Sequence, residues 1–136
     1  MLSDSKLQHI IAAVVYIALN AKPNAVRGPE ICKAQNLPER YLESDLQQLV
    51  HYGILRSVRG PKGGYVLAKE RRNITLADIY KGIGVENAET IKNGITDALK
   101  RAEDKYSEEL SKTTVEQLCA QTSQSDAQKQ KPDFTI

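Results

Sequence analysis

The segment from Ile54 to Leu67 constrains the fold of this chain more than any other stretch. Two short apolar pieces, Ile54-Leu55 and Tyr65-Val66-Leu67, flank the sequence Arg59-Gly60-Pro61-Lys62-Gly63-Gly64. Glycine and proline turn the chain sharply, and short apolar runs on either side of such a turn form a β-hairpin. Hairpin tips are often rich in glycine, but they seldom also carry arginine and lysine. We therefore predict a β-hairpin with a positively charged tip.

Helical patterns precede this hairpin. Apolar residues at helical spacing predict a helix over residues 4–20, and the segment around Pro23 ends it. A short helix is expected near 29–35 and a third over 38–51, each opened by a proline, which is favourable at the first helical position. Two short helices joined by a tight turn and followed by a hairpin have the order of a winged helix-turn-helix. The predicted fold class is therefore mainly α with a small β-hairpin wing.

Longer helical patterns follow the hairpin. Thr75 is expected to cap a helix over 76–83, and Thr113-x-x-Glu116 resembles the capping box of a last short helix. Between them, apolar residues spaced three to four apart predict the longest helix, over 90–110. Such a helix is about 30 Å long and overhangs a core this small, so we expect self-association through its apolar stripe. The stripe consists of Ile91, Ile95, Leu99, Ala102, Tyr106 and Leu110.

These patterns divide the chain into three parts. Residues 1–84 form the predicted winged helix-turn-helix domain, and residues 85–120 hold the dimerisation helix with the short C-terminal helix. Residues 121–136 are polar and lack an apolar period, so we expect a disordered tail.

The charges are distributed unevenly along the chain. Over all 136 residues, 19 Lys and Arg stand against 17 Asp and Glu, a formal net charge of +2. Residues 1–72 hold 11 basic and 6 acidic residues, a balance of +5, whereas residues 73–136 hold 8 and 11, a balance of −3. The predicted basic surface therefore belongs to the N-terminal half, where it can meet a polyanion such as nucleic acid.

The sequence argues against a membrane protein and against an enzyme. The longest apolar run, residues 10–19, is about half the roughly 20 residues that a membrane span needs, and no signal peptide is recognisable. Cys32 and Cys119 lack a CxxC partner, which is typical of free thiols in a reducing cytoplasm. No residues have the spacing of a metal site or of a nucleophile with its base. We therefore expect a cytoplasmic protein without metal, membrane contact or catalysis.

Cys32 is a candidate redox residue. Lys33 follows it directly, and a nearby cation lowers the pKa of a thiol and favours its oxidation. The alternative is a small buried residue that fills space between helices, as free cysteines usually do.

The chemistry of the hairpin tip fits DNA. Arg59 suits a narrow minor groove, while Lys62 and Arg56 suit phosphates. The start of the 38–51 helix would read the major groove, because arginine binds guanine and glutamate accepts from the cytosine amino group. The expected major-groove residues are Glu39, Arg40, Tyr41, Glu43 and Ser44. The expected wing residues are Arg56, Ser57, Arg59, Gly60, Lys62, Gly63, Gly64 and Tyr65.

The run from Arg40 to Ile83 resembles the signature of the Rrf-two family of bacterial transcriptional regulators, which includes IscR, NsrR and CymR. The matching elements are Tyr41-Leu42-Glu43, Gly53-Ile54-Leu55, Ser57-x-Arg59-Gly60-x-x-Gly63-Gly64-Tyr65-x-Leu67-Ala68 and Ile74-Thr75-Leu76-x-Asp78-Ile79. The resemblance implies a homodimer on double-stranded DNA, associated with the nucleoid when bound, which we expect to be a repressor. A two-fold dimer predicts a palindromic operator with half-sites about 34 Å, or a multiple of that distance, apart.

The sequence departs from the family members that hold an iron–sulfur cluster. Those members carry three closely spaced cysteines between the fourth helix and the long helix, whereas residues 84–90 here contain no cysteine or histidine. The N-terminus also lacks the Thr-x-x-x-Tyr start of those members. We therefore expect no cofactor; a mixed metal site of Cys119, His9 and acidic residues is the alternative.

Two other functions remain as alternatives. A winged helix can be a protein-interaction module that binds a partner protein, with the basic wing serving only solubility. Within the regulator class, a small-molecule effector could bind between the fourth helix and the long helix, although no residues in the sequence specify such a pocket.

Overall fold

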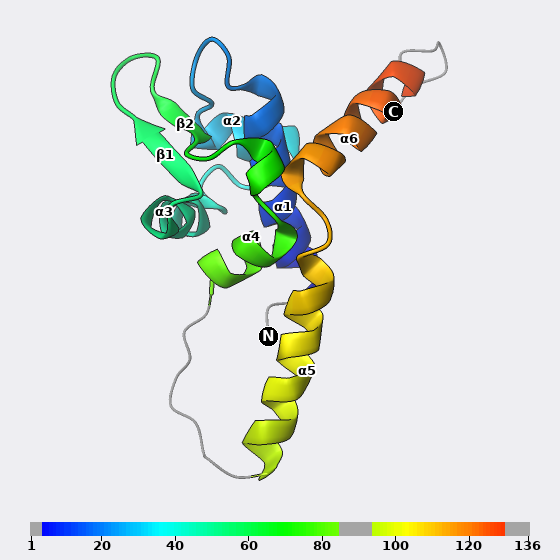
Figure 1. Cartoon of the computed structure of the whole chain (residues 1–136). Coiled ribbons are helices and arrows are strands. Elements are labelled where there is room, and N and C mark those ends of the chain that lie inside the picture. The colour runs from blue at the N-terminus through cyan, green and yellow to red at the C-terminus, as the bar shows by residue number, and fades with distance from the viewer. Residues whose placement is uncertain (1–3, 85–93, 130–136) are drawn as a thin grey trace.

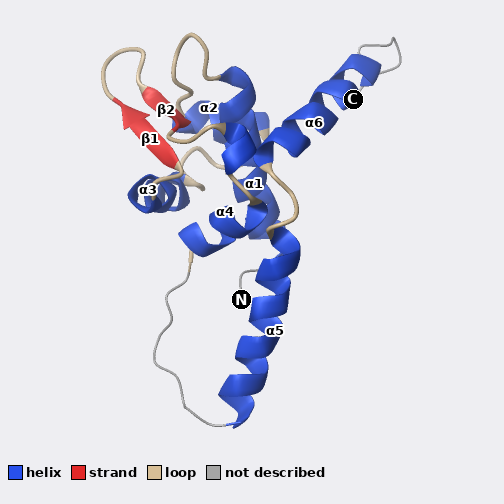
Figure 2. Ribbon diagram, viewed as in Figure 1, coloured by secondary structure: helices blue, strands red, loops and turns tan. Residues whose placement is uncertain are grey.

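The computed structural model of the chain describes residues 4–84 and 94–129 (Figure 1). Its elements are α1 (Asp4–Asn20), α2 (Gly28–Ala34), α3 (Glu43–Tyr52), β1 (Leu55–Val58), β2 (Gly64–Leu67), a short 3-10 helix η1 (Arg71–Asn73), α4 (Leu76–Gly82), α5 (Gly94–Leu110) and α6 (Val115–Lys129). Figure 2 shows the shorter helices gathered around α1, the hairpin at one edge and α5 extending away from this body. None of the described helices is long and apolar enough to cross a membrane. The predicted mainly helical fold with a hairpin wing is confirmed.

The core is built around α1. Ile10, Val14 and Ile17, which recur at helical spacing, have no exposed surface. The other elements of the body cover them with further fully or almost fully buried residues: Ile31, Leu42, Leu46, Leu49, Ile54, Leu55, Ile74 and Ile79. Helices as short as α2 and α4 are not stable alone in water. They are therefore held by this packing, to which each buried side chain contributes about 1.5–3 kcal/mol.

Backbone hydrogen bonds attach the base of the wing to the body. β1 and β2 pair antiparallel, with Val58 opposite Gly64 next to the tip. Val26, which precedes α2, adds a bridge to β2: its N–H donates to the Tyr65 carbonyl (3.0 Å), and its own carbonyl accepts from the Tyr65 N–H (2.7 Å). The segment before α2 therefore lies alongside the wing.

The start of α4 is capped and is joined to the chain that returns from α5. Thr75 caps α4 as predicted: its hydroxyl accepts from the Asp78 N–H (3.1 Å), and the Asp78 carboxylate accepts from the Thr75 N–H (2.9 Å). Beside this capping box, the Leu76 N–H donates to the Thr113 carbonyl (2.9 Å). These bonds bring the start of α6 back to the body after α5.

The third helix begins later than predicted. α3 starts at Glu43, whereas the sequence indicated a start at Pro38. Between them, the Tyr41 N–H donates to the Pro38 carbonyl (3.0 Å) and the Glu43 N–H to the Arg40 carbonyl (3.2 Å). Hydrogen bonds between residues three apart in the chain form tight turns, whereas an α-helix joins residues four apart. This path buries Leu42 completely and leaves the residues on either side of it exposed.

The cap of the last helix is shifted by one residue from the prediction. Thr114 and Gln117 form the capping box (2.9 and 3.1 Å), and not Thr113 and Glu116. The Glu116 carboxylate is used elsewhere, because it lies 2.6 Å from the guanidinium of Arg71.

The length of the last helix also differs from the prediction. α6 continues to Lys129, so residues 121–129, predicted as part of a disordered tail, are helical. No glycine or proline interrupts this stretch, and glutamine, alanine and lysine are good helix formers. α5 begins at Gly94 and ends at the predicted Leu110. Residues 90–93 and 130–136, on which the remainder of these predictions falls, lie outside the described residues.

Candidate nucleic-acid interface

Five exposed residues around the start of α3 form the first part of the candidate interface, which we call the reading surface. All five predicted major-groove residues are exposed there: Glu39, Arg40, Tyr41, Glu43 and Ser44. Arg40 Nη1 lies 3.3 Å from Glu43 Oε1, but the two side chains are 81% and 54% exposed. A pair so exposed contributes little and opens readily, so both groups are available to a ligand.

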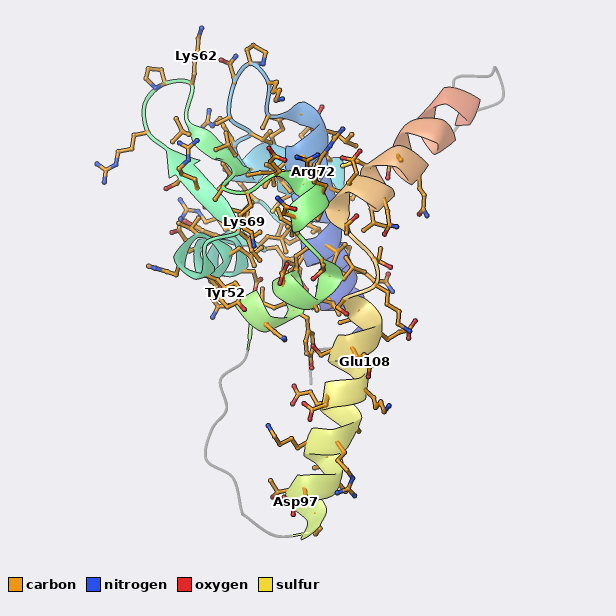
Figure 3. The ribbon with its side chains drawn as sticks, in the orientation of Figure 1. Tyr52, Lys62, Lys69, Arg72, Asp97 and Glu108 are labelled. Carbon is orange, nitrogen blue, oxygen red and sulfur yellow. The ribbon has the colours of Figure 1, made fainter. Side chains whose placement is uncertain are left out.

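The wing tip forms the second part. Arg56 and Ser57 on β1, and Arg59, Gly60 and Lys62 at the tip, are exposed. Figure 3 shows Lys62 at the end of the wing, pointing away from the body. Gly60 adopts φ 105° with open space around it, which lets the chain turn at the tip. Within the described residues, neither Arg59 nor Lys62 forms an ion pair, so both charges face solvent uncompensated.

Two of the predicted wing residues are glycines that lie where the tip of the wing joins β2. Gly63 is buried, and a Cβ there would overlap the carbonyl oxygen of Val58. A Cβ at Gly64, which adopts φ 143°, would overlap the carbonyl oxygen of Val26. Both glycines therefore permit the close backbone contacts that close the hairpin and attach it to the segment before α2.

Tyr65 lies in the core, which does not fit the predicted direct contact with DNA. Its side chain is 8% exposed, and its hydroxyl accepts a hydrogen bond from Gln47 Nε2 (2.9 Å). Burial raises the pKa of the Tyr65 hydroxyl; the bond from Gln47 opposes this rise, and the Glu43 carboxylate adds to it. The ring therefore packs the wing against α3.

A cavity of about 160 Å³ lies between the reading surface and the base of the wing. Glu39, Arg40 and Glu43 line it from one side, and Tyr65 and Cys32 line it as well. Cys32 is 1% exposed and belongs to the core. This position fits the packing alternative for Cys32, and its redox role stays a prediction.

Arg27 is a cation of the interface that sequence reasoning missed. It is exposed, and it lines a shallow hollow of about 320 Å³ together with the wing residues Gly60, Gly63 and Gly64. Within the described residues it forms no ion pair. The bridge between Val26 and β2 brings Arg27 to the wing. The available signal was a basic residue directly before the first helix of the helix-turn-helix.

The described residues of the predicted dimerisation stripe differ in exposure: those in the first half of α5 are exposed, and those near its end are partly buried. Ile95 and Leu99 are 71% and 66% exposed, and Ala102 is also exposed. Tyr106 and Leu110 are partly buried. Ile91 lies outside the described residues. The N-terminal half of α5 thus presents large apolar side chains that are mostly exposed in the described part of the chain.

Tyr80 joins α4 to the C-terminal half of α5. Its ring packs edge to face on Tyr106, with centroids 5.1 Å apart, and its hydroxyl donates to Glu103 (3.1 Å). Burial is the largest cause that raises the pKa of Tyr80, followed by the bond to the Glu103 carboxylate. A hollow of about 470 Å³ borders these residues and is also lined by Lys81 and Asp104. It lies where the effector alternative would place a ligand.

The described residues do not assemble a metal site. Within residues 4–84 and 94–129, no group of three or more His, Cys, Asp or Glu could hold a metal ion. Cys119 is 2% exposed, and burial raises the pKa of its thiol although Arg71 opposes this. His9 Nδ1 is engaged with Gln35 Oε1 (2.8 Å). The alternative site of Cys119, His9 and acids is therefore not formed in this part of the chain.

Comparison with protein families gives a match over most of the chain. The Rrf2 family, described as an iron-dependent transcriptional regulator, matches residues 3–121. The donors present do not fit an iron–sulfur cluster held by three cysteines of one chain, because the whole sequence contains two cysteines, both of them buried.

Individual relatives agree with this match. An HTH-type transcriptional regulator of Aquifex aeolicus (strain VF5) is 34% identical over 84 residues, which are 62% of this chain and 58% of that protein. The chain thus matches little more than half the length of that relative. IscR of T. potens has a TM-score of 0.70 at 26% identity, covering 90% of this chain and 88% of that one. CymR, the global cysteine regulator of B. subtilis, has a TM-score of 0.68 at 28% identity, covering 88% and 97%.

Proposed function

The chain belongs to the Rrf2 family of transcriptional regulators, and on this premise we propose that it binds double-stranded DNA as a homodimer. In this proposal the reading surface enters the major groove, and the wing, residues 59–64, enters the minor groove. Arg59 would use the negative potential of a narrow minor groove. Lys62 and Arg27 would contact phosphates, which fix position without reading sequence. Bound over a promoter, such a dimer represses transcription.

One observation carries the proposal: the polar side chains of the reading surface lie close to the exposed cations of the wing and of Arg27. The cavity under the reading surface and the hollow beside the wing share Gly28 and Pro29 in their walls. Arg40 on one side and Arg27 on the other therefore lie around the same short stretch of chain. A surface that reads DNA needs this combination, because base-edge contacts give specificity and phosphate contacts give affinity.

The exposed half of α5 supports the homodimer. Ile95 and Leu99 would be covered by the same helix of a second copy, because a two-fold interface places one patch against itself. Two recognition helices related in this way would read a palindrome with half-sites about 34 Å, or a multiple of that distance, apart.

The cysteine count supports regulation without an iron–sulfur cluster. Cys32 lies in α2 and Cys119 in α6, and both side chains are in the core. The proposed function therefore includes no switching step through iron.

The test is selection of genomic DNA fragments by the purified full-length protein at about physiological salt, followed by footprinting. We expect a protected palindrome of about two to three helical turns. If folded, dimeric protein retains no fragment, even with cell extract added to supply an effector, the proposal is wrong. Retention of a partner protein from that extract, with contact insensitive to salt, would favour the interaction-module alternative.

A further inference from the structure

α1 contacts the reading surface through a lysine in its first turns. Lys6 Nζ lies 3.1 Å from Asp45 Oδ2 on α3, and the two side chains are 26% and 16% exposed. The same ammonium lies 3.9 Å from the centroid of the Tyr41 ring and donates a long hydrogen bond to the Tyr41 carbonyl (3.4 Å). One charge of α1 is thus engaged with the side chain and backbone of the reading surface and with the helix that follows it.

The Lys6 ammonium compensates a buried carboxylate oxygen of Asp45. Its Oδ2 is buried and has no hydrogen-bond partner among the described residues, so the contact with Lys6 is an ion pair rather than a hydrogen bond. A buried carboxylate oxygen without a compensating charge is strongly unfavourable. Removal of the Lys6 ammonium would therefore drive Asp45 toward water and shift the first turn of α3, on which it lies.

A second residue of α1, His9, contacts the end of α2. His9 Nδ1 and Gln35 Oε1 are 2.8 Å apart, and Gln35 Nε2 donates to the His9 carbonyl (3.1 Å). Gln35 is the C-terminal cap of α2. The His9 ring also faces the edge of Tyr41, with centroids 6.3 Å apart. Lys6 and His9, three residues apart on one face of α1, therefore bracket the chain from the end of α2 to the start of α3.

We infer that Lys6 is a positioning residue for DNA reading: its charge is directed inward to hold Tyr41 and α3, and it is not a phosphate ligand. The inference rests on the proposed DNA-binding function. It distinguishes Lys6 from Arg59 and Lys62, whose charges face solvent. A positioning residue affects the fit to the correct bases, whereas a phosphate ligand affects all DNA equally.

The experiment compares the full-length protein with its Lys6→Met variant, which keeps an unbranched side chain of similar length without the charge. Binding to the selected operator and to a shuffled duplex is measured by fluorescence anisotropy over a range of salt concentrations. We expect operator affinity to fall about tenfold, as for the loss of one base contact. Affinity for the shuffled duplex and the slope against salt should stay as in the wild type. Lys6→Arg should restore operator binding, because the guanidinium keeps the ion pair and the contact with Tyr41.

The matched control is Lys22→Met, which removes an exposed lysine beyond the end of α1 and should change neither affinity. The inference is overturned if Lys6→Met binds the operator as the wild type does. It is equally overturned if both affinities fall together and the salt slope decreases by about 0.9, because that is the signature of a phosphate contact.

A double variant separates positioning from plain stability. Lys6→Met should lower the midpoint of unfolding, because it leaves the Asp45 carboxylate buried without its partner. In Lys6→Met/Asp45→Asn this buried charge is gone, so the midpoint should return toward that of the wild type. Operator affinity should stay low, because Tyr41 still lacks its cation. Full recovery of operator affinity in this variant, relative to Asp45→Asn alone, would overturn the inference. Amide exchange of residues 39–45 should be faster in Lys6→Met and that of residues 55–67 unchanged. That readout needs no DNA, so it tests Lys6 even if the wild type binds no DNA and the proposed function fails.

Discussion

The wing and α5 both extend beyond the packed body, and they expose different kinds of side chain. The wing tip exposes Arg59 and Lys62, whereas α5 exposes Ile95 and Leu99. Exposed cations are well hydrated and normal on a folded chain, but large apolar side chains together on one helix face leave a surface that association would remove from water. For this reason we propose a polyanion as the partner of the wing and a second copy as the partner of α5.

The two projections are also attached differently. The wing is held at its base by the β1–β2 ladder and by the bridge from Val26. α5 is held through Tyr106, whose ring packs on Tyr80 in its C-terminal half. The orientation of the wing is thus fixed within one chain, while that of the N-terminal half of α5 would be fixed by its partner. Substitutions in the wing and in α5 test this contrast.

Leu99→Glu should abolish the dimer while leaving the wing intact. A two-fold interface loses the side chain twice, at about 2 kcal/mol each, which is about a thousandfold in the dimer dissociation constant. Analytical ultracentrifugation measures this constant. Arg101→Glu, on the opposite face of the helix, is the control and should remain dimeric. A dimeric Leu99→Glu protein would show that α5 is not the interface.

Gly64→Ala should disrupt the contact between the wing and the segment before α2. Its Cβ would overlap the Val26 carbonyl at a φ that disfavours side chains, so we expect a loss of about 3 kcal/mol in the free energy of unfolding. Urea denaturation measures it. Gly60→Ala has a similar positive φ but open space, and should cost only about 1 kcal/mol. Equal losses in the two variants would mean that the contact with Val26 does not hold the wing.

Arg59→Ala should weaken operator binding by about tenfold, with reduced preference for A·T-rich sequence, because a minor-groove arginine reads groove width. Competition between operators that differ only in the A·T content of the wing-contacted segment measures the preference. Stability should not change, since Arg59 is exposed and unpaired within the described residues. An unchanged preference together with weaker binding would assign Arg59 to phosphate contact alone.

Lys62→Ala should weaken binding to all sequences similarly and reduce the slope of log affinity against log salt by about one unit. Titrations on operator and on shuffled DNA at several salt concentrations measure it. The outcome that contradicts the proposed role of the wing is an operator affinity that neither Arg59→Ala nor Lys62→Ala changes.

Tyr65→Phe should leave operator affinity unchanged, because the ring packs inside the base of the wing. It should cost about 1 kcal/mol of stability through the lost bond with Gln47. The raised pKa of Tyr65 means that the folded state favours the neutral hydroxyl. This contribution to stability is present below the unfolded pKa of about 10 and is lost as pH rises through the folded value. Tyr65→Phe should therefore reduce the alkaline loss of stability, measured by urea denaturation from pH 8 to 11. A large loss of DNA affinity in Tyr65→Phe would show that the Tyr65 hydroxyl contacts DNA.

The elements with a strong local signal were predicted well. The period of α1, the proline in the first turn of α2 and the capping threonine of α4 act on residues close to them in the chain, so the sequence displays them directly. The start of α3 was predicted too early, since Pro38 is compatible with either a helix or a turn. The burial of Leu42 decides for the turn, and that burial is a contact with distant residues. The cap of α6 was missed for a similar reason, because Glu116 of the expected box pairs with Arg71.

The candidate site also contains residues that the sequence indicates locally and residues whose place depends on distant contacts. Arg59, Lys62 and the residues of the reading surface were identified from their chemistry and spacing, and the structure exposes them. Tyr65 belongs to the same sequence motif but packs in the core. Arg27 was missed, because its place beside the wing depends on the bridge between Val26 and β2.

The amino-acid sequence alone predicts the helical periods, the hairpin and the positive charge of its tip, and it contains too few cysteines for a three-cysteine cluster. These properties are local or compositional, and no folding is needed to state them. Only the tertiary contacts establish which exposed groups share a surface, that Lys6 faces Asp45 and Tyr41, and which described residues of α5 are exposed. Each of these depends on contacts between residues far apart in the chain, which only the packed core brings together.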